Sequence, residues 1–308
     1  MASVACADPS GRIAAGKTST TVPFDFSRNH IAVLALINGR GPFLFLLDSG
    51  AERNVIDKSL VKTLGLKIRG GGHIRGIGSQ RVGTLQTENT TVQIGDAAIP
   101  DQKFLTYDFT DLRKALPAFQ GILGINVLKD FVVRLDYAHS LLTLTLPVGF
   151  NHHKGGIVLP LSFTYDHIPQ VDGRIDGLNG KFKIDTGDDS VITLYTPFIE
   201  RNSLKTKYAP QNQPSPRYGA GGETQVIEVP DLLFHIEGID ANLDAHLPVM
   251  LSLAQSGTTT DKESAGQVGN GFLQAFTVTI DDSRKQIIFE PRTDLGQVTP
   301  AKEPEKKP

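Results

Sequence analysis

The chain has 308 residues, of which 39% are hydrophobic and 21% are charged, and its formal net charge is -2. This composition is typical of a globular protein with enough apolar residues to form a core. The near-neutral charge gives no basic face for nucleic acid and no polybasic anchor for a membrane surface. No stretch approaches the roughly 20 apolar residues of a membrane-spanning helix. The 31 glycines and 18 prolines indicate a mostly β protein with many turns.

The first 21 residues are predicted to be a disordered N-terminal segment. It contains Cys6, the only cysteine, so neither an intrachain disulfide nor a cysteine-based metal site is expected. The stretch Ala5-Cys6-Ala7 resembles a cleavage site, which predicts a periplasmic or secreted protein if a signal peptide was trimmed and a cytoplasmic one otherwise. The segment 11–18 fits a phosphate-binding loop, but no buried strand precedes it and no helix follows, so that interpretation is rejected.

A continuous apolar run, 43–47, leads into Asp48-Ser49-Gly50. Such a run predicts a strand buried on both faces, so that Asp48 emerges from the core at its end. Asp57 is then expected to cap a helix over 58–64 that ends before Gly65. A glycine-rich hairpin over 73–80 and the segment GILGINVLKDFVVRLD, which begins at Gly121, complete the first half.

The second half of the chain repeats this order. An alternating strand ends at Asp185-Thr186-Gly187, 137 residues after the first copy, and a helix capped by Thr196 and a glycine hairpin over 217–224 follow. The segment GQVGNGFLQAFTVTID, which begins at Gly266, matches the Gly121 segment at an offset of 145 residues. Two matching pairs at similar offsets indicate duplication of one lobe.

The repeat therefore predicts two β-rich lobes with a few short helices, related by pseudo-twofold symmetry. The first lobe is expected over 22–148 and the second over 149–293, with the boundary in the segment 147–155. A tail over 294–308 is predicted to be disordered, because from Thr299 onward it contains prolines and charges with a single alanine as its apolar residue.

An Asp-Ser/Thr-Gly tripeptide by itself usually forms a surface turn, because all of these residues favour turns. Two such turns at corresponding places in duplicated lobes can instead bring two carboxyl groups together for catalysis. Two carboxyls a few Å apart share one proton, so one acts as a base and the other as an acid. A water between them can then attack a scissile carbonyl while the protonated carboxyl stabilises the developing oxyanion. This chemistry requires neither a metal nor a cofactor, and none is expected.

These motifs resemble those of the retropepsin-like and pepsin-like aspartic peptidases, in the duplicated single-chain form of bacterial members. The resemblance covers about residues 22–292. It implies an all-β, bilobal fold of two retropepsin-like barrels, with Asp48 and Asp185 as the catalytic pair. It also implies that Ser49, Gly50, Thr186 and Gly187 support the two turns, and that Ile122-Leu123-Gly124 threads behind the first turn. The hairpins resemble flaps that close over substrate, with expected flap or substrate-binding residues Gly76, Gly78, Tyr218, Gly219 and Gly221.

Three features depart from the family pattern. Asp188 and Asp189 follow the second turn and, if close, should raise the pKa values of the pair and move its active range toward neutral pH. Gln267 lies where an apolar residue is expected. The flap tyrosine, Tyr218, occurs only in the second half, which leaves open which hairpin covers the substrate.

The sequence therefore predicts an aspartic endopeptidase that acts on protein or peptide substrates, with no nucleic-acid partner and no membrane span. A monomer is expected, and a homodimer whose matching halves pair across chains is the alternative. The competing function is a catalytically inactive peptide-binding module with the same fold, and Asp188-Asp189 is the feature that motivates it.

Overall fold

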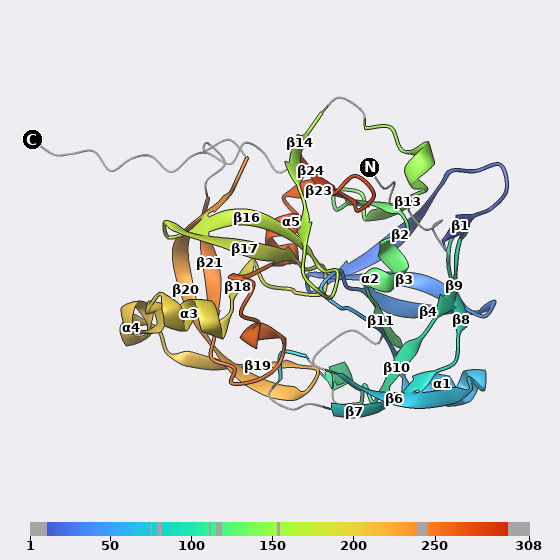
Figure 1. The fold of residues 1–308 in the computed structure, drawn as a ribbon, viewed down its shortest axis with the longest axis horizontal. Helices are drawn as coiled ribbons and strands as arrows, with labels where there is room; N and C mark the ends of the chain where they lie inside the picture. The colour runs from blue at the N-terminus through green and yellow to red at the C-terminus, as the bar shows by residue number, and fades with distance from the viewer. Residues whose placement is uncertain are drawn as a thin grey trace, which may run out of the picture.

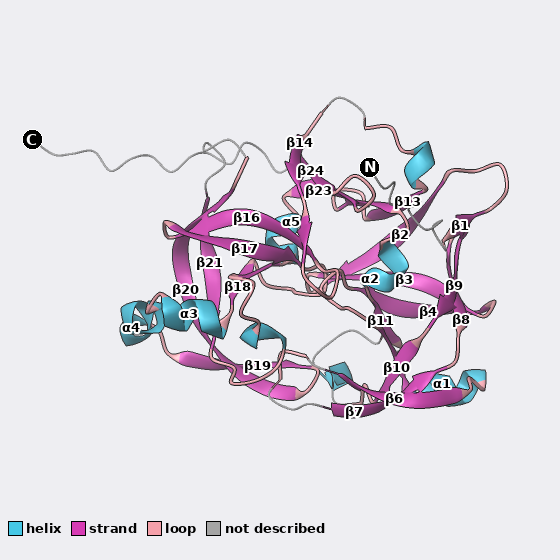
Figure 2. Ribbon diagram, in the orientation of Figure 1, coloured by secondary structure: helices cyan, strands magenta, loops and turns pink. Residues whose placement is uncertain are grey.

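The computed structural model describes residues 11–74, 76–78, 82–110, 112–114, 119–152, 155–238 and 245–294. In these residues the chain is mostly β, with a few short helices, and it forms two β-rich lobes (Figures 1 and 2). This is the predicted fold class. None of the helices in the described ranges is both long and apolar enough to cross a membrane.

The larger sheet contains the strands of the first half and three from the second half. Its strands are β1 (Arg12–Ile13), β2 (Ser19–Ser27), β3 (His30–Ile37), β4 (Arg40–Leu47), β5 (Asn54–Asp57), β6 (Ile68–Ile74), β7 (Val82–Thr87), β8 (Thr90–Ile94), β9 (Ala97–Gln102), β10 (Phe104–Tyr107), β11 (Gly121–Leu123), β12 (Val132–Asp136), β13 (Leu141–Thr145), β14 (Ile157–Pro160), β23 (Phe276–Asp281) and β24 (Gln286–Pro291).

The smaller sheet lies wholly in the second half. Its strands are β15 (Ser162–Phe163), β16 (Pro169–Ile175), β17 (Leu178–Ile184), β18 (Ile192–Leu194), β19 (Pro214–Gly219), β20 (Gly222–Ile236), β21 (Ala245–Ser252) and β22 (Gly266–Val268). The α-helices are α1 (Lys58–Leu64), α2 (Ile125–Leu128), α3 (Thr196–Arg201), α4 (Leu204–Tyr208) and α5 (Asn270–Leu273). The 3₁₀ turns are η1 (Leu112–Lys114), η2 (Pro147–Gly149), η3 (Ala209–Gln211) and η5 (Thr258–Thr260).

The two halves are joined by a ladder that follows their internal symmetry. Strand β12 pairs antiparallel with β23, so that Val132 lies opposite Asp281 and Asp136 lies opposite Thr277. In the repeat, Val132 corresponds to Thr277 and Asp136 to Asp281, because each pair is 145 residues apart. Exchanging the two halves therefore maps this ladder onto itself, as a pseudo-twofold axis between β12 and β23 requires.

Corresponding strands also carry the two Asp-Ser/Thr-Gly turns. Strand β4 pairs in parallel with β11, and β17 pairs in parallel with β22, so each turn begins at the end of a central strand. Phe45, Leu47, Phe182 and Ile184 are fully buried, as the apolar runs before the aspartates predict. The core fixes both turns in the same way, because a corresponding pair of strands supports each one.

The N-terminal prediction was wrong for part of its range. Residues 12–13 form β1, which pairs with β9, and β2 begins at Ser19 and pairs with β13. These strands are stabilised by pairing with strands that are distant in the chain. A prediction of disorder from the local sequence does not take such partners into account. A strand follows the glycine segment 11–18, which agrees with the rejection of a phosphate-binding loop. Residues 1–10 and 295–308 lie outside the described residues.

The sheets do not divide at the proposed lobe boundary. Strands β14, β23 and β24 come after residue 149, yet they belong to the larger sheet. The ends of both halves thus form a shared wall, and the division at 148/149 remains a proposal. Helix α1 begins and ends as predicted, with Asp57 as N-cap and Gly65 in the left-handed conformation after it. The predicted cap at Thr196 was wrong, since Thr196 lies inside α3 and its hydroxyl donates to the carbonyls of Ser252 and Ala254.

Asp281 and Asp136, which correspond in the repeat, allow the contribution of a buried and a partly exposed aspartate of the shared wall to be compared. Asp281 is fully buried and accepts hydrogen bonds from Ser283, Arg284 and Gln286, whereas Asp136 is half-buried and bonds His139. We expect Asp281→Ala to lower the free energy of unfolding by about 1 to 3 kcal/mol, because it leaves the donors of Ser283, Arg284 and Gln286 without their buried acceptor. Asp136→Ala should cost less than about 1 kcal/mol. Urea denaturation of both variants checks this, and equal losses would contradict it.

Candidate active site

The two Asp-Ser/Thr-Gly turns have the same internal hydrogen bonds. The amide of Asp48 donates to the carbonyl of Leu123 at 2.9 Å, and the amide of Asp185 donates to Val268 at 3.0 Å. One carboxyl oxygen of each aspartate accepts from the glycine amide two residues later, at 2.9 Å in both turns. The segment 122–124 therefore lies against the first turn as predicted, and 267–269 occupies the same place in the second.

The two turns are connected to each other by the hydroxyls of Ser49 and Thr186. The Ser49 Oγ donates to the carbonyl of Ile184 at 2.7 Å and accepts from the amide of Thr186 at 3.0 Å. In return, the Thr186 Oγ1 donates to the carbonyl of Leu47 and accepts from the amide of Ser49, both at 2.9 Å. Both residues are buried, so these four bonds hold the turns in a fixed relation without competition from water.

The glycines of the turns bring the two carboxyl groups together. A Cβ atom on Gly50 would lie 2.4 Å from the Cγ of Asp185, and one on Gly187 would lie 2.3 Å from the Cγ of Asp48. Each aspartate therefore packs on the glycine of the opposite turn, where no side chain fits. The two carboxyl groups also form a hydrogen bond with each other, so the structure brings the predicted pair into direct contact.

The surroundings of the pair favour its protonated form. Burial raises the pKa of Asp48, while the hydrogen bond to Asp185 opposes this rise. Burial, the charge of Asp48 and the charge of Asp188 raise the pKa of Asp185 well above its usual range. Two carboxyls coupled in this way lose their protons in two steps, and between the steps they share one proton.

Asp188, which departs from the family pattern, is held in a network within the second half. Its carboxyl accepts from the Ser190 amide and hydroxyl, from the Thr193 hydroxyl, and from Gln267 Nε2 at 2.7 Å. Arg217 Nη2 lies 2.8 Å from the Asp188 Oδ1 and also pairs with Asp189. The acidic residues therefore lie beside the second turn as expected, and an arginine compensates their charge.

Gln267, the second departure, belongs to the same network. Its Oε1 accepts from the hydroxyl of Tyr195 at 2.6 Å while its amide nitrogen donates to Asp188. Neither Arg217 nor Tyr195 was identified from the sequence as part of the site. The available signal was that two polar departures, Asp188 and Gln267, occur in the same half at positions that the parallel pairing of β17 and β22 brings close.

The two glycine hairpins meet at their tips. The amide of Gly78 donates to the carbonyl of Ala220 at 3.0 Å, and a Cβ on Gly219 would lie 2.4 Å from the Cγ1 of Ile77. A third segment joins them, since the amide of Thr258 donates to the carbonyl of Gly76 at 3.0 Å. Figure 1 shows β6, β7 and β19 along one edge of the molecule. The predicted glycines 76, 78, 219 and 221 all lie at this junction, although part of the first tip lies outside the described residues.

Tyr218 has a different environment from Arg217, its neighbour in β19. Tyr218 is 58% exposed, and its hydroxyl forms a hydrogen bond with Glu223. Successive residues of a strand point to opposite faces, so Arg217 points the other way and reaches Asp188. A flap role for Tyr218 stays a prediction.

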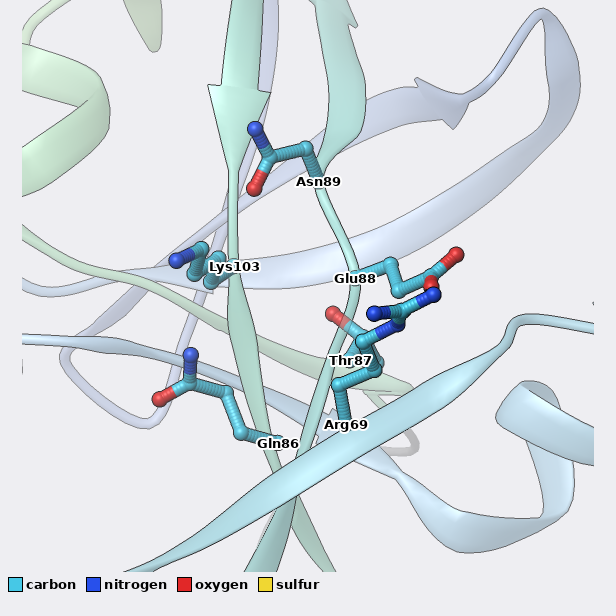
Figure 3. Close-up of a pocket in the computed structure, with 6 residues that line it drawn as sticks. All are labelled: Arg69, Gln86, Thr87, Glu88, Asn89 and Lys103. Carbon is cyan, nitrogen blue, oxygen red and sulfur yellow. The ribbon is translucent and has the colours of Figure 1, made fainter.

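A shallow polar pocket lies apart from the two turns, on the strands around β6, β7 and β10. Figure 3 shows its lining residues, Arg69, Gln86, Thr87, Glu88, Asn89 and Lys103, of which Arg69 and Glu88 form an ion pair. No residue of either turn lines it. Across the described part of the chain, no cluster of three or more histidine, cysteine, aspartate or glutamate side chains has the arrangement to hold a metal ion.

Comparison with known proteins supports the resemblance seen in the sequence. Residues 33–127 match the family model described as aspartyl protease. Among solved structures, the aspartic proteinase from Irpex lacteus matches with a TM-score of 0.58 at 14% sequence identity, over 89% of this chain and 98% of that one. No curated protein sequence matches the chain. The predicted resemblance to the aspartic peptidases and the predicted bilobal β fold are confirmed.

The hydroxyl of Thr186 is expected to stabilise the junction of the turns. Thr186→Val should lower the free energy of unfolding by about 2 to 4 kcal/mol, because the buried amide of Ser49 and the buried carbonyl of Leu47 lose their partners. Thr186→Ser keeps both hydrogen bonds and should cost no more than about 1 kcal/mol for the lost methyl group. Chemical denaturation measures the difference, and similar losses in the two variants would show that the hydroxyl is unimportant.

Asp185 is expected to make the folded state less stable at neutral pH than in acid. Its pKa is raised in the folded protein, so the stability present below the ordinary aspartate pKa is lost as the pH rises through the folded value. Asp185→Asn should therefore stabilise the protein at pH values above the folded pKa, and the gain should vanish in acid. Thermal unfolding across pH tests this, with the exposed Asp172→Asn as a control that should stay within about 0.5 kcal/mol of the wild type. A gain that does not depend on pH would contradict it.

Proposed function

We propose that this chain, whose first half matches the aspartyl protease family and whose fold is that of an aspartic proteinase, is an aspartic endopeptidase with Asp48 and Asp185 as its catalytic pair. The observation that carries this proposal is the reciprocal packing of the two carboxyls on Gly187 and Gly50. It leaves two coupled carboxyls with raised pKa values side by side, which is the arrangement needed to activate a water.

The pair performs hydrolysis by moving protons to and from the water and the scissile peptide bond. Burial raises the pKa of Asp48 but its hydrogen bond to Asp185 opposes this rise, whereas the pKa of Asp185 is raised well above its usual range. Asp48 is therefore the ionised member, and Asp185 holds the shared proton. Asp48 takes a proton from the water as the water oxygen attacks the scissile carbonyl carbon, while Asp185 donates to the carbonyl oxygen. The tetrahedral intermediate collapses when the proton taken by Asp48 passes to the amide nitrogen, the C–N bond breaks, and the hydroxyl formed from the carbonyl oxygen returns its proton to Asp185. The products are a carboxylic acid and an amine.

The substrate binds in extended conformation, hydrogen-bonded along its backbone as an added strand. The two hairpin tips, 76–78 and 219–222, contact each other directly, so both cover the bound peptide and must separate for it to enter. Glycines at the junction allow this close contact, because a side chain on Gly76 or Gly78 would overlap the opposite backbone.

The alternative function, an inactive peptide-binding module, was motivated by the extra charge of Asp188 and Asp189. Arg217 pairs with both residues, and Asp188 also receives hydrogen bonds from neutral donors. This compensation reduces the extra negative charge beside the pair. The ion pairs therefore favour the enzyme over the module.

Peptide-library cleavage from about pH 3 to about pH 8 tests the proposal. The wild type should cleave, and Asp48→Asn and Asp185→Asn should each lower kcat by at least about 1,000-fold, since either change removes half of the proton-transfer system. Asp172→Asn, which alters an exposed aspartate of the same half, should leave cleavage unchanged.

Two results would count against the enzyme. Full activity in either dyad variant would show that the pair is not catalytic. Peptide binding without cleavage by the wild type at every pH would support the inactive module.

A further inference from the structure

Arg217 connects the second hairpin to the second catalytic turn. It lies in β19, two residues before the tip residue Gly219, and its side chain is 20% exposed. Its guanidinium donates to Asp188 Oδ1 at 2.8 Å, to Asp189, and to the sulfur of Met250 in β21 at 3.1 Å. One side chain thus links the hairpin, the neighbouring strand and the residues that follow Gly187.

Asp188 is a buried carboxylate that needs this partner. It is 5% exposed. Its other contacts among the described residues come from neutral donors, which are the amide and hydroxyl of Ser190, the hydroxyl of Thr193 and the amide of Gln267. Neutral donors orient a carboxylate, but they leave its charge uncompensated. Arg217 is the cation among its contacts in the described part of the chain.

The backbone of Asp188 belongs to the catalytic turn. Its amide lies 3.3 Å from the carbonyl of Asp185, and its carbonyl accepts from the amide of Asn270 at 2.8 Å. Ala51 makes the same two contacts in the first turn, with Asp48 and Ile125. The first turn therefore has an uncharged methyl group where the second has a carboxylate, and only the second turn can respond to a nearby cation in this way.

The other titratable groups around Asp188 come from several elements. Asp189 follows it in the same turn, Asp185 and Asp48 form the dyad, and Tyr195 lies between β18 and α3. Glu228 in β20 acts on Arg217 from the hairpin side. None of these groups is a cation, so Arg217 is the group around Asp188 in the described residues whose charge opposes that of the carboxylates. The charge of Asp188 raises the pKa of both dyad members.

We propose that Arg217 is a positioning residue whose charge cancels the buried charge of Asp188. The position of the β19–β20 hairpin, which carries Arg217, thereby sets the pH range in which the dyad holds one proton. When the hairpin carries Arg217 away, Asp188 becomes an uncompensated anion beside Asp185 and the dyad retains its protons to higher pH. When the hairpin closes, the charge is cancelled and the dyad reaches its one-proton state at lower pH. This proposal rests on the proposed function of the dyad.

The pH dependence of kcat/KM tests the coupling through a pair of opposite substitutions. Arg217→Met should move both limbs of the profile to higher pH by ~0.5 to 1 unit, because it exposes the dyad to the full charge of Asp188. Asp188→Asn should move both limbs to lower pH, and the double variant should lie between the two. Arg217→Lys keeps the charge and should restore most of the wild-type profile.

A purely structural role for Arg217 predicts a different result. Arg217→Met would then lower activity at every pH without moving either limb, and that outcome would overturn the proposal. Arg174→Met, which removes a half-exposed arginine paired with Glu237 in the same half, is the matched control and should leave the profile in place. If Arg217→Met fails to fold, Asp188→Asn should still move both limbs to lower pH and the double variant should move them less, and an Asp188→Asn profile identical to that of the wild type would overturn the proposal.

A readout that does not depend on cleavage separates this proposal from the proposed function. Titration of the aspartate side-chain carboxyls by ¹³C NMR reports the dyad directly in wild type, Arg217→Met and Asp188→Asn. Opposite shifts of the dyad signals in a protein that cleaves no peptide would support the coupling and refute the peptidase. Cleavage by a protein whose dyad titrates identically in all three forms would support the peptidase and refute the coupling.

Discussion

The reciprocal hydrogen bonds between Ser49 and Thr186 are the interaction on which the rest of the site depends. Each hydroxyl both donates to the strand end before the opposite turn and accepts from the opposite turn's amide. Because these bonds are buried, they fix two loops from distant parts of the chain at one separation. The carboxyl groups of Asp48 and Asp185 come into contact as a consequence, and a strained or mobile connection would not hold them there.

This contact between the carboxyl groups requires the two turns to have the same local structure, and the strands of the two sheets provide it. Strands β4 and β17 bring the two aspartates out of the core in the same way, with β11 and β22 beside them. The symmetric ladder between β12 and β23 then joins the halves at their ends. The core strands thus set the local geometry of each turn, and the shared wall sets how the turns face each other. Both are needed, since either alone leaves the carboxyls unpaired.

The two halves differ in the residues that follow the Asp-Ser/Thr-Gly turns. The first turn is followed by Ala51, whereas the second is followed by Asp188, whose charge is balanced by Arg217 from the hairpin. Gln267 and Tyr195 complete this network. Duplication produces two equal carboxyls, and the network gives them unequal surroundings. In the proposed mechanism, these unequal surroundings distinguish the acid from the base although their tripeptides are nearly identical.

The sequence by itself determined the parts of this protein that local patterns and the repeat specify. These are the strands that end at Asp48 and Asp185, the glycines that follow, the helix capped by Asp57 and the duplicated β fold. Tertiary structure decided the contacts made across long separations, such as Arg217 with Asp188, the meeting of the hairpin tips, and the pairing of β1 with β9. The physical reason is that a strand's register selects which neighbour points inward, so Arg217 faces the turn while Tyr218 faces solvent. Register depends on the partner strand, and the local sequence does not contain that partner.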